Sequence, residues 1–67
     1  MESTRDAGVR SYLQNLTRNQ LEADIDGCER FAARLAAERH PDAITRIQVA
    51  NNDSRLAIAY ETLNGAS

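Results

Sequence analysis

The chain carries one thiol and one imidazole, Cys28 and His40, and these side chains commonly serve as nucleophile and base. Twelve positions separate them in the sequence, from 28 to 40. On one helix that spacing corresponds to about 18 Å at 1.5 Å per residue. A nucleophile and its base must lie within hydrogen-bond distance, so the spacing excludes a catalytic pair within one chain. The sequence contains neither a phosphate-binding glycine loop nor a Cys/His cluster, so it predicts no enzyme, metal or cofactor.

Taken singly, the same two residues have structural interpretations. Cys28 falls on an apolar helix face and is expected to be a small buried hydrophobe, with crosslinking or redox sensing as the alternative. His40 precedes Pro41 and is expected to be a turn residue. A single cysteine forms no internal disulfide, and no signal peptide or long apolar run is visible, so we expect a reducing, cytosolic environment.

Charged side chains supply the candidate binding residues. Glu22, Asp26 and Glu29 fall within about 60° of one another on a helix of 100° per residue, either as a solvated acidic face or as a patch that docks on a positive surface. All eight basic residues are arginine, a side chain suited to interface contacts, although a GC-rich coding sequence also explains this usage. The candidate partner-binding residues are Arg5, Arg10, Arg39, Glu22, Asp26 and Glu29.

A long helix over residues 17–39 must position most of these groups. Thr17 and Gln20 form a capping box at its start. An apolar seam then repeats at steps of four and three, through Leu21, Ile25, Cys28, Ala32 and Leu35. The helix that carries this seam has about 22 residues, or a length of roughly 33 Å, and the seam requires another long helix against it.

Two further helices are predicted, over residues 4–15 and 42–63. The first is too short to be stable alone and must dock on something. The third follows the Pro41 joint and has two apolar stripes, one with Ile44, Ile47 and Ile58, the other with Val49, Leu56, Tyr60 and Leu63. Tyr60 is expected in the core, with an exposed anchor for a partner as the alternative. Residues 51–54 are weak helix formers, and either a break or a continuous helix with a polar midsection is compatible with them.

These elements predict an all-α single domain over residues 1–67. We expect a short N-terminal helix followed by a long antiparallel helical hairpin, which dimerises into a four-helix-type bundle. A chain of 67 residues has a marginal core, and oligomerisation often supplies the missing burial. The predicted core and dimer seam consists of Leu21, Ile25, Cys28, Leu35, Ile47 and Ile58.

Bulk charge limits the class of partner. The net charge is −2 and the isoelectric point is about 5.2, which argues against direct binding to nucleic acid or to an anionic membrane. With no Trp and only three aromatic residues, the chain also lacks a stacking platform for single strands.

Three segments resemble small phage-encoded quorum-sensing anti-activators: residues 16–22 (LTRNQLE), 38–43 (ERHPDA) and 51–56 (NNDSRL). None is a diagnostic motif. The resemblance implies a helical homodimer in the cytoplasm of a bacterial host cell, which blocks a surface of LuxR-type transcription regulators and can also bind the pilus-assembly ATPase. It also implies that an arginine near the N-terminus, Arg5 or Arg10, contacts the regulator.

The sequence and this resemblance together predict a non-enzymatic interaction protein that inhibits a bacterial regulatory protein. Two alternatives remain: a small DNA-binding or antitoxin-type regulator, which would need a basic recognition helix, and a structural helical-hairpin subunit of a larger assembly.

Overall fold

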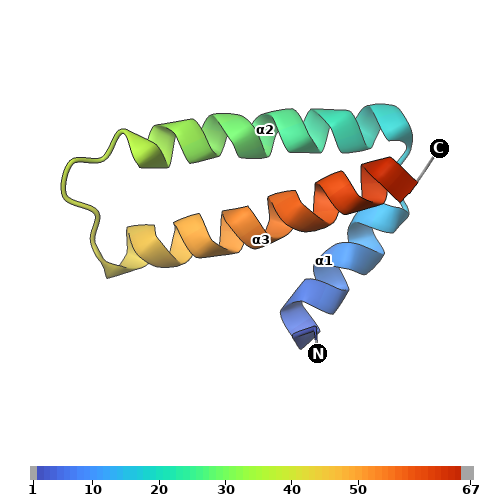
Figure 1. Cartoon of the computed structure of the whole chain (residues 1–67), viewed down its shortest axis with the longest axis horizontal. Helices are drawn as coiled ribbons and strands as arrows, with labels where there is room; N and C mark the ends of the chain where they lie inside the picture. The colour runs from blue at the N-terminus through green and yellow to red at the C-terminus, as the bar shows by residue number, and fades with distance from the viewer. Residues whose placement is uncertain (1, 66–67) are drawn as a thin grey trace.

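The computed structural model describes residues 2–65, and in this range the chain is all-helical, as predicted. Helix α1 spans Thr4–Gln14, α2 spans Arg18–Ala36 and α3 spans Ala43–Gly65. The chain turns back after α2, and α3 lies alongside it, while α1 lies beside the C-terminal half of α3 (Figure 1). Helix α2 ends three residues before the predicted position 39, because its last turn tightens into i→i+3 bonds such as Glu38 N–H to Leu35 O.

Each helix begins at a side-chain cap. Ser3 accepts a bond from the Asp6 N–H at 3.1 Å, and Thr17 and Gln20 form the predicted capping box. At α3 the Asp42 carboxylate accepts from the Thr45 N–H at 2.7 Å, and this bond lowers the pKa of Asp42. A lowered pKa means that the cap supports the folded state above about pH 4 and loses that effect as the pH falls further.

Helix α3 is continuous through residues 51–54, which resolves the alternative left open by the sequence. Asn52, only 8% exposed, donates its side-chain amide to the backbone carbonyl of Cys28 at 2.9 Å. This bond satisfies a buried polar group and ties the middle of α3 to the middle of α2. The polar midsection is therefore part of the helix–helix contact.

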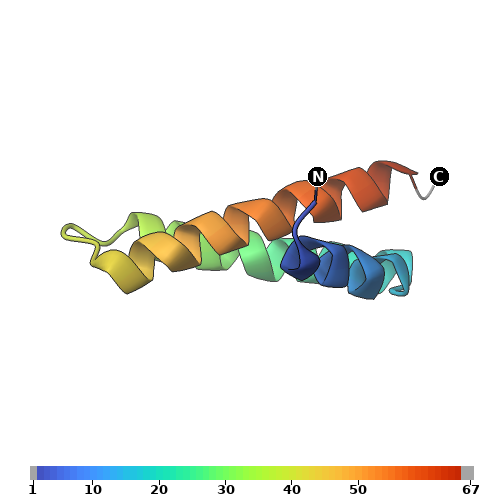
Figure 2. The ribbon, with the colours of Figure 1, turned by 90° about the horizontal axis from the view of Figure 1, so that it is seen from below.

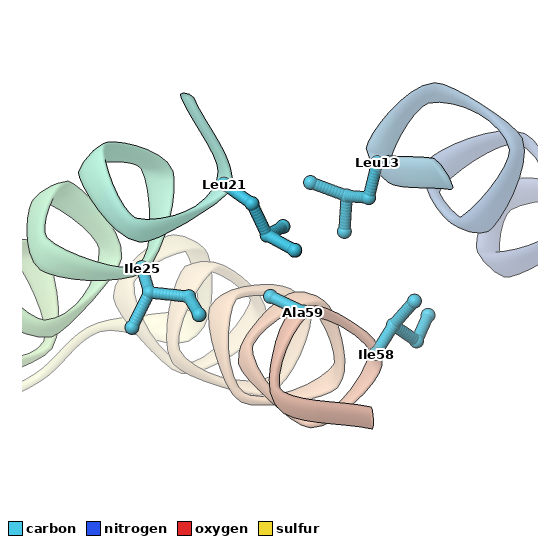
Figure 3. Packing of buried hydrophobic residues seen from close by; sticks show 5 residues of the cluster. All are labelled: Leu13, Leu21, Ile25, Ile58 and Ala59. Carbon is cyan, nitrogen blue, oxygen red and sulfur yellow. The ribbon is translucent and has the colours of Figure 1, made fainter. Parts of the chain in front are cut away.

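All three helices contribute to the core (Figure 3). Leu13 comes from α1, Leu21 and Ile25 from α2, and Ile58 and Ala59 from α3. Cys28 is also buried, and Leu35, farther along the same face of α2, is half-buried. The predicted seam on α2 is thus confirmed over its first half, where α1 completes the packing.

The apolar surface of α3 is only partly covered. Ile58 lies in the core, but Ile44 and Ile47 of the same stripe are 67% and 59% exposed in the single chain. Helix α1 has 11 residues against 23 in α3, so at 1.5 Å per residue it spans only about half of its neighbour. The N-terminal half of α3 and the facing end of α2, called here the tip, therefore have no third helix (Figure 2).

Tyr60 lies at the surface, so its predicted place in the core is wrong. It is 43% exposed, and its hydroxyl donates to the carboxylate of Glu29 on α2. Helix α2 approaches α3 between the two apolar stripes, at Asn52 and Ala59, which leaves Tyr60 on the flank. A phenol has an apolar ring and a polar hydroxyl, and it is stable at such a boundary.

The molecule is flat, with extents of 40 × 26 × 14 Å and a radius of gyration of 12.7 Å. A compact chain of this length has a radius of gyration of about 11 Å. The accessible surface is 4972 Å², whereas a compact monomer of 7.4 kDa exposes about 4200 Å². The single chain therefore exposes roughly 750 Å² more than a compact monomer of its mass.

Candidate partner-binding surface

The three candidate acidic residues are exposed along α2, but each already has a partner. Glu22 forms an ion pair with Arg18 at 3.0 Å, Asp26 pairs with Arg30 at 3.1 Å, and Glu29 accepts the Tyr60 hydroxyl. Such exposed pairs contribute little to stability. Arg18 and Arg30 balance the charges of Glu22 and Asp26 locally, and this arrangement weakens the case for an acidic docking patch.

The three candidate arginines do not form one site. Arg10 is half-buried, and it bonds to Glu2 on one side and Glu61 on the other, at 2.9 and 3.0 Å. These two carboxylates raise its pKa, and the bridge to Glu61 holds α1 against α3. Arg39 lies in the exposed connection at the opposite end of the molecule (Figure 1). Arg10 thus stabilises the packing of α1 on α3. Arg5 and Arg39 are more available than Arg10 for contact with a partner.

A polar cluster that the sequence did not predict joins the three helices. Asp24 on α2 binds Arg55 on α3 through two bonds, at 2.7 and 3.3 Å, and the Arg55 guanidinium lies 5.7 Å from the centroid of the Tyr12 ring on α1. The bonds to Asp24 raise the pKa of Arg55. In the sequence both residues look like ordinary surface charges. One sequence feature could have pointed to Asp24: it precedes Cys28 by one helical turn, and this spacing places it at the border of the apolar seam.

Cys28 lies beside this cluster, and its small side chain is buried. Burial raises the pKa of its thiol, and the nearby charge of Asp24 acts in the same direction. His40 lies in the connection beyond the end of α2, and among residues 2–65 no group of three metal-binding side chains occurs. The arrangement of these residues offers no nucleophile–base pair.

Because the thiolate is the reactive form, we expect Cys28 to react slowly with a thiol-modifying reagent in the folded protein. At mildly alkaline pH the rate should be at least about tenfold below that in urea, since unfolding removes both burial and the neighbouring charge. A colorimetric disulfide-exchange assay measures both rates. Equal rates in the two conditions would contradict the buried position.

Surface cavities lie along the helices of residues 2–65, among them the following three. One of about 290 Å³ is lined by Arg10, Gln14, Glu61, Thr62 and Gly65. A second of about 260 Å³, called here the Arg5 cavity, is lined by Arg5, Phe31, Gln48, Asn51, Asn52 and Arg55. A third of about 250 Å³, called here the Val49 hollow, is lined by Ala32, Leu35, Ala36, Val49, Asn52 and Asp53. The last two include residues of the tip that α1 leaves uncovered.

Comparisons with protein-family models, curated proteins and solved structures found no match to this chain. Within residues 2–65 no helix combines the length and the apolar character needed to cross a membrane.

Proposed function

We propose that this protein is a non-enzymatic interaction module, a homodimer that binds and blocks a bacterial regulatory protein. The observation that supports the proposal is the exposed apolar surface: Tyr12, Phe31, Ile44, Ile47, Val49 and Tyr60 are all exposed in a chain of 67 residues. A large exposed apolar surface is typical of an interaction site.

For the dimer, we propose that the antiparallel hairpin of α2 and α3 pairs with a second copy through the Val49 hollow. The excess of roughly 750 Å² per chain is close to the 800 Å² or so that each partner buries in a standard interface. Two tips, each two helices thick, would form a four-helix bundle. The alanines and Leu35 of the hollow allow the close helix approach that such a bundle needs.

The dimer is tested by light scattering at micromolar concentration, where we expect a mass twice the 7.4 kDa of one chain. Val49→Glu should give a monomer, because it places a charge at the centre of the proposed interface. The matched control is Ile44→Glu, which adds the same charge on the other flank of the same helix and should leave the dimer intact. A wild-type mass of 7.4 kDa, or dissociation by the control alone, would contradict the assignment.

For the target, the sequence resemblance favours a LuxR-type transcription regulator, with the pilus-assembly ATPase as a second binding partner. Blocking a surface requires no catalytic group, and the sequence predicts none. Affinity capture of the tagged protein from bacterial lysate, followed by mass spectrometry, tests this proposal. One stoichiometric regulator or ATPase would support it, and recovery of nucleic acid, or of the protein alone, would argue against it.

A further inference from the structure

From the lining of the Arg5 cavity, we infer that it receives the carboxylate of an aspartate or glutamate from an amphipathic helix of a protein partner. This inference rests on the proposed interaction function and specifies the chemistry of the contact. The cavity lies where the N-terminal end of α1 meets the tip, and its lining combines two guanidinium groups, three carboxamides and one aromatic ring.

The donors that line the cavity are incompletely used. The Arg5 side chain is 53% exposed, and its nearest carboxylate, Asp6, is 3.9 Å away. Among residues 2–65, the side-chain amides of Gln48 and Asn51 form no hydrogen bond. Arg55 binds Asp24 through Nε and Nη2 only. A carboxylate accepts several such donors at once, and bonds to a charged acceptor are stronger than neutral ones.

The other two cavities do not offer this chemistry. In the cavity of about 290 Å³, Arg10 is already bound by Glu2 and by Glu61, and Glu61 itself lines the cavity, so an incoming carboxylate would meet another carboxylate there. The Val49 hollow has no cationic side chain in its lining and includes Asp53. Charge complementarity therefore selects the Arg5 cavity for an acidic group.

The size and surroundings of the cavity favour a side chain on a helix. At about 260 Å³ it is below the roughly 300–1,000 Å³ of small-molecule sites and holds one or two side chains. Ile44, Ile47, Gln48 and Asn51 follow the i, i+3, i+4, i+7 spacing and so share one face of α3. A partner helix can therefore bind the side-chain amides of Gln48 and Asn51 with its carboxylate. The apolar residues of its next turn can then pack against the two isoleucines.

The test is a titration of the ¹⁵N-labelled full chain with two short helical peptides, followed by NMR. One peptide has a central glutamate flanked by leucines, and the other has glutamine at that position. We expect the glutamate peptide to shift the amides of Arg5, Phe31, Gln48 and Asn51 and to bind about tenfold more tightly, the effect of one charge-assisted bond. Equal affinities, shifts confined to other residues, or no binding of the glutamate peptide would overturn the inference.

Two variants test whether Arg5 supplies the positive charge that binds the glutamate peptide. Arg5→Gln should reduce the affinity for the glutamate peptide to that of the glutamine peptide, because it removes the most exposed guanidinium of the cavity. Arg18→Gln removes the same charge at the start of α2, outside the cavity lining, and should have no effect. An equal loss in both variants would indicate a general charge effect and overturn the inference.

The same variants separate this inference from the proposed function. If the wild-type chain captures a stoichiometric target and Arg5→Gln captures as much, the interaction function stands and the cavity assignment fails. If the glutamate peptide binds at the cavity and the chain captures no protein target, the cavity assignment stands and the inhibitor function fails.

Discussion

Replacing Leu13 with alanine is expected to lower the free energy of unfolding by about 3 kcal/mol. Leu13 is 0% exposed and is the only buried residue of α1. It contacts Leu21 and Ile58 in the core, where the three helices meet (Figure 3). Removing its branched end leaves a cavity in this core, because the other α1 side chain packed against it, Val9, is only partly buried. In a domain whose total stability is on the order of 5 kcal/mol, this loss is severe.

The measurement is urea unfolding followed by far-ultraviolet circular dichroism. Both proteins must be compared at one concentration, because the stability of a dimer depends on it. Gln14→Ala is the matched control: it changes the neighbouring, exposed residue of the same helix and should alter stability by less than about 0.5 kcal/mol. A loss below about 1 kcal/mol for Leu13→Ala would show that α1 does not complete the core.

Replacing Asp24 with alanine is expected to cost about 2 kcal/mol, the second large effect. The substitution leaves Arg55 without the carboxylate that its guanidinium binds at 2.7 Å. Both side chains are largely shielded, so water replaces the lost bond only in part. The expected loss is below the 3–5 kcal/mol of a fully buried pair, because Arg55 retains some exposure.

A double-mutant cycle isolates the pair from its surroundings. Asp24→Ala, Arg55→Ala and the double variant should give a coupling energy of at least about 1 kcal/mol. The same cycle on Asp26 and Arg30, an exposed i,i+4 pair on α2 at 3.1 Å, should give about 0.3–0.5 kcal/mol and lose it at high salt. Equal coupling in the two cycles would contradict the structural role given to Asp24.

The local parts of the fold follow from short-range sequence patterns. Thr17 and Gln20 lie three residues apart, and a capping box depends on nothing more distant. The seam residues Leu21, Ile25 and Cys28 are buried because a period of 3.6 residues places them on one face. The existence of three helices and the identity of most core residues on α2 were therefore predictable from the sequence.

The candidate site depended on contacts across the chain. Asp24 and Arg55 are 31 positions apart, and whether they meet depends on how α3 lies along α2. Arg5 and Arg10 look alike in the sequence, yet Arg10 faces Glu61 on α3, whereas Arg5 faces the uncovered tip. No local pattern distinguishes the two, because the difference comes from where α1 ends on its neighbour.

By itself, the sequence determined the helices, their caps and the apolar faces, since these depend on residues within one or two turns. The tertiary structure decided how those faces are shared. Helix α1 covers Ile58 and leaves Ile44 and Ile47 exposed, and α2 approaches between the stripes and leaves Tyr60 on the flank. The length and direction of α1 therefore set which apolar side chains form the core of one chain and which remain for a partner.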